Sequence, residues 1–495
     1  MKKYLSILIV CTLTFGCTEE WLSLYPTNRI ADDQAVQTVS DGRAAMNGVY
    51  VRMKEYYMYG RNFFVCADVG CEDVVLRTDN SNRYVRDYRW DPQPGNVPGI
   101  EMWQYTYNAI KRANEVIQRL TGVTPDAGET VEERDHIVGE AYFIRALLHY
   151  ELVKFFAQAY NHTSDASHLG IPYIEESTME VDHPRLSVKV CFEKIIADAE
   201  TALTMMDADK PANPYTAGKD AVRALLARVY LYMASTNNGA NYAKAAQYAE
   251  QLINATIATG AKRYTLVDAE DYKITGSNTA FSSPKMWGAD YSTESIFVLP
   301  YTPTERIYTN SLSNIYLDKN KGYGDLKPSE QLMALFDEED SRFTIFYEYD
   351  KAMCSRKFMG TGIAGGFDLS NLNIFRLSEM YLIAAEGNAK ASSPDPAKAL
   401  TFLNSLKTNR GLEEVSLSGQ ALINEIILER RRELCFEGHA LIDHKRLNTS
   451  IVRTEDETNP ENQKFGLVYP HNYFAFPIPD TETNTNKLIE PNPGY

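Results

Sequence analysis

Arg145-Ala146-Leu147-Leu148 recurs identically as Arg223-Ala224-Leu225-Leu226, and each copy lies in a stretch that mixes alanines with tyrosines. A short Asn/Gly turn at 237–239 comes after the second copy, and beyond it lie apolar residues at helical spacing: Tyr242, Ala246, Ala249 and Ile253. Small residues that face bulky aromatic ones allow two helices to pack closely as an antiparallel hairpin. The same scheme returns at 377–410, around the turn Pro394-Asp395-Pro396. The sequence therefore predicts helical hairpins like those of tetratricopeptide repeats, although without a regular period.

Apolar periodicity extends this pattern along most of the chain. It predicts helices over roughly 39–57, 102–121, 131–159, 187–206, 217–235, 241–259, 375–391, 396–409 and 419–437. Strand signals are short and scattered, as at 295–299. Two stretches, about 60–100 and about 260–370, have no helical period and are rich in Tyr, Trp, Asn and Asp. Because long loops of this kind usually carry function, we expect a mainly α protein whose rigid helices present binding loops.

The first residues have the order of a secretory signal peptide: two lysines, a short apolar run from Tyr4 to Phe15, and the small residue Gly16. The apolar run is about half the ~20 residues that a membrane-spanning helix needs, so we expect it to be removed. Cys17 at the cleavage point resembles the lipid-carrying cysteine of bacterial lipoproteins, although Thr14 stands where an aliphatic residue is usual. The segment therefore predicts a protein outside the cytoplasm that is lipid-anchored through Cys17.

Composition narrows the possible partners and chemistry. The formal charge of −16 argues against nucleic acid as a partner, and 44% hydrophobic residues suffice for a core. The cysteines after Cys17 are an odd and sparse set, which is not a disulfide framework: Cys66, Cys71, Cys191, Cys354 and Cys435. Cys66 and Cys71 could pair, but burial as small apolar residues is favoured. Zinc would need further Cys or His at ligand spacing, so we expect no metal.

Several motifs follow one another along the chain, and the most recognisable is the helix Glu140-Ala141-Tyr142-Phe143-Ile144-Arg145-Ala146. The others are Trp21-Leu22-Ser23-Leu24-Tyr25-Pro26, Asn47-Gly48-Val49-Tyr50, Trp103-Gln104-Tyr105 through Ala113-Asn114, Arg376-Leu377-Ser378-Glu379 with Ala385-Glu386, Glu429-Arg430 through Glu437-Gly438, Phe476-Pro477-Ile478-Pro479 and Asn492-Pro493-Gly494-Tyr495. In this order they resemble the SusD/RagB family of outer-membrane lipoproteins. His439 departs from the family pattern, which prefers Arg there. The resemblance covers nearly the whole chain after the signal peptide.

This resemblance implies a signal peptide at 1–16 and a single SusD-like α domain at 17–495, built on a right-handed superhelix of hairpins. Most hairpins would lie in the part up to about 260, and a loop-rich insert and closing helices would occupy 261–495. The family's function implies a lipoprotein, anchored in the outer membrane and facing the cell exterior, that binds a glycan. It would deliver this oligosaccharide to a SusC-like TonB-dependent transporter.

Two clusters in the irregular stretches have the residue types that a sugar site needs, because pyranose rings stack on aromatic faces and their hydroxyls bind planar polar groups. The residues that we select as ligand-binding candidates are Asn80, Asn82, Arg83, Tyr84, Arg86, Tyr88 and Trp90 in the first cluster, and Trp287, Asp290, Tyr291, Tyr301 and Tyr308 in the second. Any one of them could instead pack a loop onto the helices. The arginine run in the first cluster could also bind an acidic sugar, but Asp79, Asp87 and Asp91 lie among the arginines and can neutralise them.

Catalytic and cofactor motifs are weak in this sequence. Glu429, Glu433 and Glu437 share a helix face beside three arginines, which favours a structural ion-pair network over catalysis. The glycine-rich stretch at 360–365 fits a dinucleotide fingerprint literally, but the residues after it have no helical pattern. Asp318-Lys319-Asn320-Lys321-Gly322 is similar to the start of a calcium loop but lacks its continuation, which favours a solvated turn. We expect a non-enzymatic protein without cofactor; an oligopeptide-binding protein of the same transporter type and a scaffold that binds no small ligand remain the alternatives.

Overall fold

The computed structural model describes residues 36–177, 180–207, 209, 213–234, 239–277, 280–281, 285–288, 290–360, 369–454 and 466–495. Cys17, the expected signal peptide and most of the glycine-rich stretch lie outside the described residues.

Helices dominate the described chain. The α-helices are α2 (Val39–Met53), α3 (Asn62–Asp68), α4 (Val85–Tyr88), α5 (Val97–Leu120), α6 (Val131–Phe156), α7 (Val188–Met205), α8 (Lys219–Met233), α9 (Gly239–Ile253), α10 (Ala269–Tyr272), α11 (Leu312–Tyr316), α12 (Glu330–Met333), α13 (Leu377–Lys390), α14 (Pro396–Asn409), α15 (Gly419–Leu434), α16 (Ala440–Leu447) and α17 (Asp480–Thr483). The 3-10 helices are η3 (Tyr308–Asn310), η4 (Ser341–Ile345) and η5 (Asn472–Phe474). Every helix that periodicity predicted is present, and the mainly α fold is confirmed.

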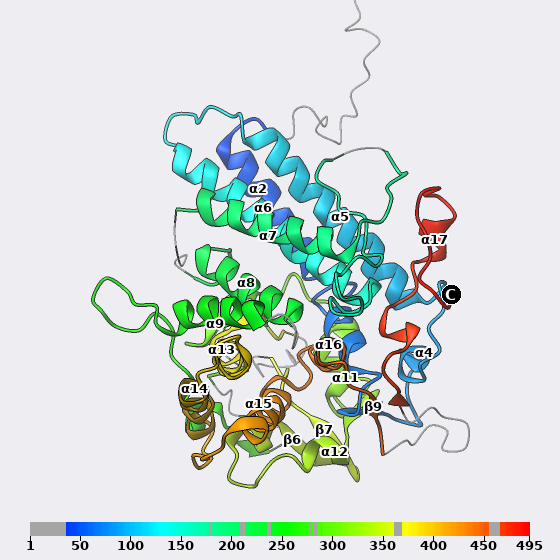
Figure 1. Ribbon diagram of the computed structural model, residues 1–495, viewed down its shortest axis with the longest axis vertical. Coiled ribbons are helices and arrows are strands. Elements are labelled where there is room, and N and C mark those ends of the chain that lie inside the picture. The colour runs from blue at the N-terminus through cyan, green and yellow to red at the C-terminus, as the bar shows by residue number, and fades with distance from the viewer. Residues whose placement is uncertain are drawn as a thin grey trace, which may run out of the picture.

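Consecutive long helices pack as hairpins in a continuous layer. α5 packs on α6, α6 on α7 and α8 on α9, and α13 then packs on α9 and on α14. In Figure 1 this layer runs from α2 and α5–α7 at the top to α13–α15 at the lower left. Gly387 of α13 allows its close approach to α9, because a Cβ there would lie 2.6 Å from the carbonyl oxygen of Tyr242. Ala246, one of the small residues that predicted the hairpins, lies at the same contact, 2.8 Å from that Cβ position.

The repeated Arg-Ala-Leu-Leu tetrapeptide buries its apolar residues in both helices. Ala146, Leu147, Leu148 and their counterparts Ala224, Leu225 and Leu226 have no exposed surface. The two arginine side chains bind carboxylates at the edge of the core: Arg145 forms a bidentate pair with Asp198, and Arg223 pairs with Asp220. Each copy thus positions a helix in the core and adds a charged pair at its edge.

Strands occur as two-stranded antiparallel pairs, several of which join distant segments. They are β1 (Val74–Leu76) with β5 (Leu326–Pro328), β2 (Gly276–Ser277) with β3 (Ala280–Phe281), β4 (Ser295–Leu299) with β8 (Leu372–Arg376), β6 (Phe346–Tyr349) with β7 (Ala352–Ser355), and β9 (Ile451–Val452) with β10 (Gly466–Leu467). The β1–β5 pair, with Val75 opposite Lys327, connects the first irregular stretch to the second.

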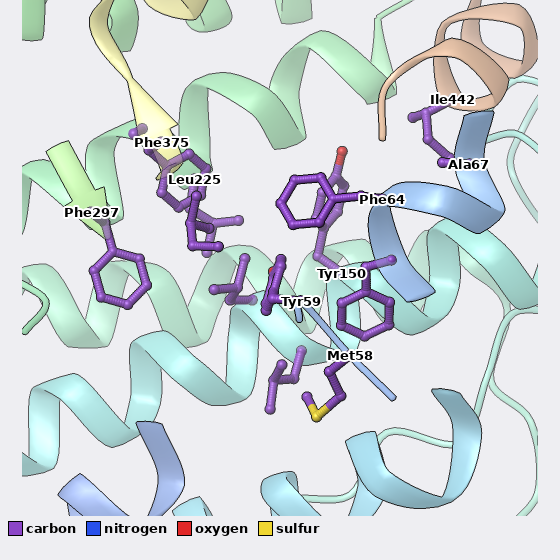
Figure 2. Packing of buried hydrophobic residues seen from close by; sticks show 14 of the residues in the cluster. Met58, Tyr59, Phe64, Ala67, Tyr150, Leu225, Phe297, Phe375 and Ile442 are labelled. Carbon is purple, nitrogen blue, oxygen red and sulfur yellow. The ribbon is translucent and has the colours of Figure 1, made fainter. Parts of the chain in front are cut away.

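One large hydrophobic cluster runs from Val36 to Ile489 through both the helical layer and the loop-rich part. Side chains from α3, α6, α8, β4, β8 and α16 meet in it, as Figure 2 shows for Phe64, Tyr150, Leu225, Phe297 and Phe375. The five cysteines of the described chain are buried free thiols, so Cys66 and Cys71 are not paired with each other. No helix among the described residues is long and apolar enough to cross a membrane.

The glutamates of the predicted network do form buried ion pairs, but Glu437 lies beyond α15, which ends at Leu434, and the arginines bound to Glu433 come from other segments of the chain. Glu433 accepts hydrogen bonds from Arg342, Arg376 and Arg410, and Glu429 and Glu437 pair with Arg342 and Arg376 respectively. Because the arginines come from η4, β8 and the end of α14, the network ties the closing helices to the loop-rich part.

Candidate functional site

The two irregular stretches meet beside α5. Besides the β1–β5 pair, Ser81 donates to the carboxylate of Asp325 through both its backbone N–H and its hydroxyl. Arg83 donates to the carbonyl oxygen of Thr309 at 3.0 Å and lies 4.1 Å from the ring centre of Tyr323. Arg61 donates to Asn310 Oδ1 at 3.2 Å. These contacts hold residues 61–83 against residues 309–328.

A cavity of about 640 Å³ lies at this junction, which is the volume of a small-ligand site. Its lining combines aromatic rings, amides, guanidinium groups and carboxyls: Tyr56, Arg61, Asn82, Arg83, Tyr84, Val85, Arg86, Asp87, Arg89, Asp91, Asn96, Val97, Pro98, Glu101 and Asn310. The short helix α4 and the first turn of α5 form much of the wall. We call this cavity the loop cleft.

Arg61 organises the floor of the loop cleft. It is 6% exposed, and its guanidinium carbon lies 4.6 Å from the ring centre of Tyr56 and 5.6 Å from that of Tyr84. Its Nε and Nη1 donate to the side-chain oxygens of Asn62 and Asn310. The hydroxyl of Tyr84 also donates to Asn62 Oδ1, at 2.6 Å. The aromatic and planar polar groups are therefore held in fixed positions before any ligand arrives.

Three half-buried tyrosines form a ledge next to the loop cleft. Tyr57 and Tyr105 stack with ring centres 3.7 Å apart and an interplanar angle of 2°, and Tyr56 lies 3.9 Å from Tyr57. The hydroxyl of Tyr56 reaches Glu101 Oε1 at 3.4 Å, inside the cleft. Burial raises the pKa of Glu101 despite its hydrogen bonds from Asn62 and Tyr56. The ledge thus continues the aromatic wall of the cleft toward solvent.

Asp87 has an unusual environment in the wall of the loop cleft. Its Oδ1 accepts a hydrogen bond from Asn96 at 2.8 Å, whereas Oδ2 is buried without a hydrogen-bond partner in the described structure. Burial raises the pKa of Asp87 to about 6, against the opposing effect of the Asn96 hydrogen bond.

The structure brings four of the residues selected from the sequence together at the loop cleft: Asn82, Arg83, Tyr84 and Arg86. Asn80 lies just behind it, where its amide closes a turn by donating to the carbonyl oxygen of Arg77. Tyr308, which is 60% exposed, begins the short helix η3 that ends at the cleft residue Asn310. The tip of the second cluster therefore adjoins the first.

Other selected residues lie in the core instead of at the cleft. Trp90 is 4% exposed, donates to the carbonyl oxygen of Gly70 and packs near Phe474. Tyr88 is fully buried under the guanidinium of Arg453. Trp287 is 6% exposed beneath Lys357. Burial gives these three rings a packing role, because their faces are covered by the protein itself.

The remaining candidates are separate from the cleft lining. The hydroxyl of Tyr301 donates to the carbonyl oxygen of Lys54, at the end of α2, and so supports the segment that carries Tyr56. Tyr291 is 43% exposed and meets Tyr215 edge-on, and the carbonyl oxygen of Asp290 accepts from Asn371. Neither Asp290 nor Tyr291 lines the loop cleft.

The calcium-like turn does not offer a vacant carboxylate. Asp318 is buried, and its Oδ2 accepts from Lys321 at 2.6 Å and from the Tyr347 hydroxyl at 2.7 Å. The described residues contain no group of His, Cys, Asp or Glu arranged to hold a metal ion.

Sequence reasoning missed Tyr56, Tyr57, Arg61 and Glu101 as site residues. Tyr56 and Tyr57 fell within a predicted helix, and Tyr105 belonged to a segment that we read as a helical motif. The signal that could have found them is the aromatic run Tyr56-Tyr57-Met58-Tyr59 directly before the first irregular stretch.

Comparisons with known proteins find relatives of one family over most of the chain. A family model described as starch-binding and associating with the outer membrane matches residues 29–231, and a SusD family model matches residues 349–495. SusD-like protein P2 of Formosa agariphila is 26% identical over an alignment that covers all of both chains. SusD-like protein P38 of the same organism is 21% identical and covers 91% of this chain and 93% of its own.

Solved structures share the fold. A SusD superfamily protein from Bacteroides thetaiotaomicron superposes with a TM-score of 0.80 at 26% identity, covering 92% of this chain and 100% of its own. A SusD superfamily protein from Bacteroides vulgatus gives a TM-score of 0.80 at 25% identity, covering 93% and 100%. The chain belongs to the SusD/RagB family of carbohydrate-binding proteins that associate with the outer membrane and bind their ligands without catalysing a reaction.

Proposed function

We propose that this chain captures an oligosaccharide at the loop cleft and passes it to a SusC-like TonB-dependent transporter, while a lipid on Cys17 anchors it at the outer face of the outer membrane. The observation that supports oligosaccharide binding is the loop cleft itself, where aromatic rings and planar polar groups converge on a cavity of about 640 Å³. This is the combination that a pyranose requires.

The aromatic groups of the site are placed for stacking. Tyr56 lines the cleft, and the Tyr57–Tyr105 stack continues the row of rings beside it. Tyrosine buries a large area with few rotatable bonds, so ordering it costs little entropy on binding. Several sugar units could therefore lie along the cleft and its ledge.

The polar groups supply directed hydrogen bonds. The amides of Asn82, Asn96 and Asn310 line the cleft, and Arg61 and Arg83 hold guanidinium planes at its floor and rim. Because Arg61 and Arg83 are already fixed by Asn310 and Thr309, the site requires little rearrangement to accept a ligand.

The test of the ligand site is affinity electrophoresis against polysaccharides, followed by calorimetry with oligosaccharides of those that retard the protein. Tyr56→Ala and Tyr57→Ala should each weaken binding about fivefold, since one aromatic contact is worth about 1 kcal/mol. Tyr291→Ala is the matched control, because Tyr291 is an exposed tyrosine outside the cleft and its loss should leave affinity unchanged.

The same experiment separates the alternatives. Calorimetry that detects binding of peptide mixtures but of no glycan would indicate an oligopeptide-binding protein. Binding of neither would indicate a scaffold that binds no small ligand. Equal losses in the Tyr56→Ala and Tyr291→Ala variants would contradict the assignment of the cleft.

The transporter and the anchor have their own tests. Co-purification from detergent-solubilised outer membranes should yield a stoichiometric TonB-dependent transporter. Cys17→Ser should release the protein from the membrane fraction without changing its affinity for glycan in solution. Retention of that variant in the membrane would contradict lipid anchoring.

A further inference from the structure

The charges around the loop cleft are balanced only in part. Asp79 pairs with Arg77, which belongs to the arginine run, and with Lys319, and it does not line the cleft. Asp91 pairs with Arg86, and both side chains are more than half exposed. Four arginines and three carboxyls line the cleft, although the chain as a whole carries a net charge of −16.

Three of these arginines, Arg61, Arg83 and Arg89, form no ion pair with a carboxylate of the described residues. The hydrogen-bond acceptors of Arg61 are amide oxygens, and that of Arg83 is a carbonyl oxygen. Arg145, Arg228 and Arg446 each hold a carboxylate in a bidentate pair, whereas the buried Arg185 bonds, like Arg61, only to carbonyl and amide oxygens. Arg61 differs from Arg185 in that it lines a cavity, where an anion can reach its guanidinium, and the carboxyl of Glu101 in the same cavity balances its charge only at a distance.

The geometry also leaves the charges of the cleft arginines accessible to a ligand. Arg83 lies over the ring of Tyr323 with one nitrogen on Thr309, which orients the planar donor group. Burial raises the pKa of Asp87, the carboxyl carried by α4 in the wall, to about 6, so its opposing negative charge is lost only as the pH falls through that value.

We propose that the glycan bound in the loop cleft is anionic, and that Arg61, Arg83 and Arg89 bind its carboxylate or sulfate groups. This inference rests on the proposed glycan-binding function and specifies its substrate class. Guanidinium groups bind both kinds of anion through charge-assisted hydrogen bonds, which are about twice as strong as neutral ones. The tyrosine ledge then stacks the sugar rings.

The test is affinity electrophoresis against uronate-containing and sulfated polysaccharides, each beside its own neutral counterpart after carboxyl reduction or desulfation. The protein should be retarded by at least one acidic polysaccharide and much less by its neutral counterpart. The preference should fall as salt rises from about 0.05 M to 0.5 M, because exposed charges are screened over about 10 Å at 0.1 M. The carboxyl-reduced and desulfated arms show which anion is bound.

Variants assign the effect to the arginines. Arg83→Gln and Arg89→Gln should each lower affinity for the acidic ligand severalfold to tenfold and reduce its salt dependence. Arg119→Gln is the control, because it changes the charge equally at the far end of α5, about 27 Å from Glu101 along the helix. Tyr56→Ala should weaken acidic and neutral ligands alike.

Two results would overturn the inference in different ways. Equal retardation by acidic polysaccharides and their neutral counterparts, or binding of neutral polysaccharides alone, removes the anionic ligand but leaves glycan binding intact. No retardation by any member of the panel removes the proposed glycan-binding function as well.

Discussion

Replacing Glu433 by glutamine should destabilise this protein far more than any exposed carboxylate would. Glu433 has no exposed side-chain surface and is within 3.0 Å of nitrogens of Arg342, Arg376 and Arg410. Burial alone would raise its pKa, but Arg410 and Arg376 outweigh burial, so its pKa lies well below the ordinary value. The carboxylate is therefore charged at neutral pH and is the common acceptor of three buried cations.

The expected loss of unfolding free energy is about 3–5 kcal/mol, which is the range for breaking a buried ion pair and leaving its partners uncompensated. Urea unfolding, followed by tryptophan fluorescence and circular dichroism, would measure it as a lower midpoint with an unchanged slope. The matched control is Glu425→Gln on the same helix. The Glu425 side chain is 17% exposed and pairs with Lys407 and Arg432, so its loss should cost about 1 kcal/mol or less.

The pH dependence gives a second readout of the same network. Because the pKa of Glu433 is depressed in the folded state, its contribution is present above the ordinary value of 4.5 and is lost as pH falls through the folded-state pKa. A loss below about 1 kcal/mol at pH 7, or a loss equal to that of Glu425→Gln, would refute the view that this network fastens the closing helices.

Three further predictions concern stability and packing. His444→Gln should lower the free energy of unfolding by about 1 kcal/mol below pH 6.5 and by less as the pH rises through the folded-state pKa, because the bond to Glu72 raises the pKa of His444 although burial alone would lower it. A pH-independent loss in urea titrations would argue against this. Gly70→Ala should lower the unfolding midpoint, because its Cβ would lie 2.7 Å from the ring of Trp90, whereas Gly48→Ala, with open space around it, is the control. The five buried thiols should resist an aqueous thiol reagent until the protein unfolds, and fast labelling of the native protein would contradict their burial.

The helical layer could be predicted from sequence because its signal is local. Apolar periodicity and small residues at hairpin contacts are properties of about 15 neighbouring residues, and these properties predicted α5–α9 and α13–α15. The observed α5 begins at Val97, five residues before the predicted start, because Pro98 fits the first turn of a helix. α3 and α16 were not predicted, since they are short and stabilised by contacts with the rest of the core.

The site was only half predictable, because exposure is not a local property. Tyr84 and Trp90 have similar surroundings in the sequence and are both 4% exposed, but Tyr84 borders the cleft, whereas Trp90 donates to the carbonyl oxygen of Gly70 in the core. Arg61 gains its place in the cleft from Asn310, which no spacing in the sequence relates to it. The sequence could identify residue types suited to sugar binding, whereas their assembly depended on the β1–β5 pair.

The bonds from Arg61 to Asn310 and from Arg83 to Thr309 span 249 and 226 residues of chain. During synthesis and export the first half of the site therefore exists long before the second half arrives. A chain cut between the two halves could keep its first hairpins and their circular dichroism, yet it would hold no complete cleft. Under the proposed function, ligand binding at the cleft would thus report completed folding more sensitively than helix content does.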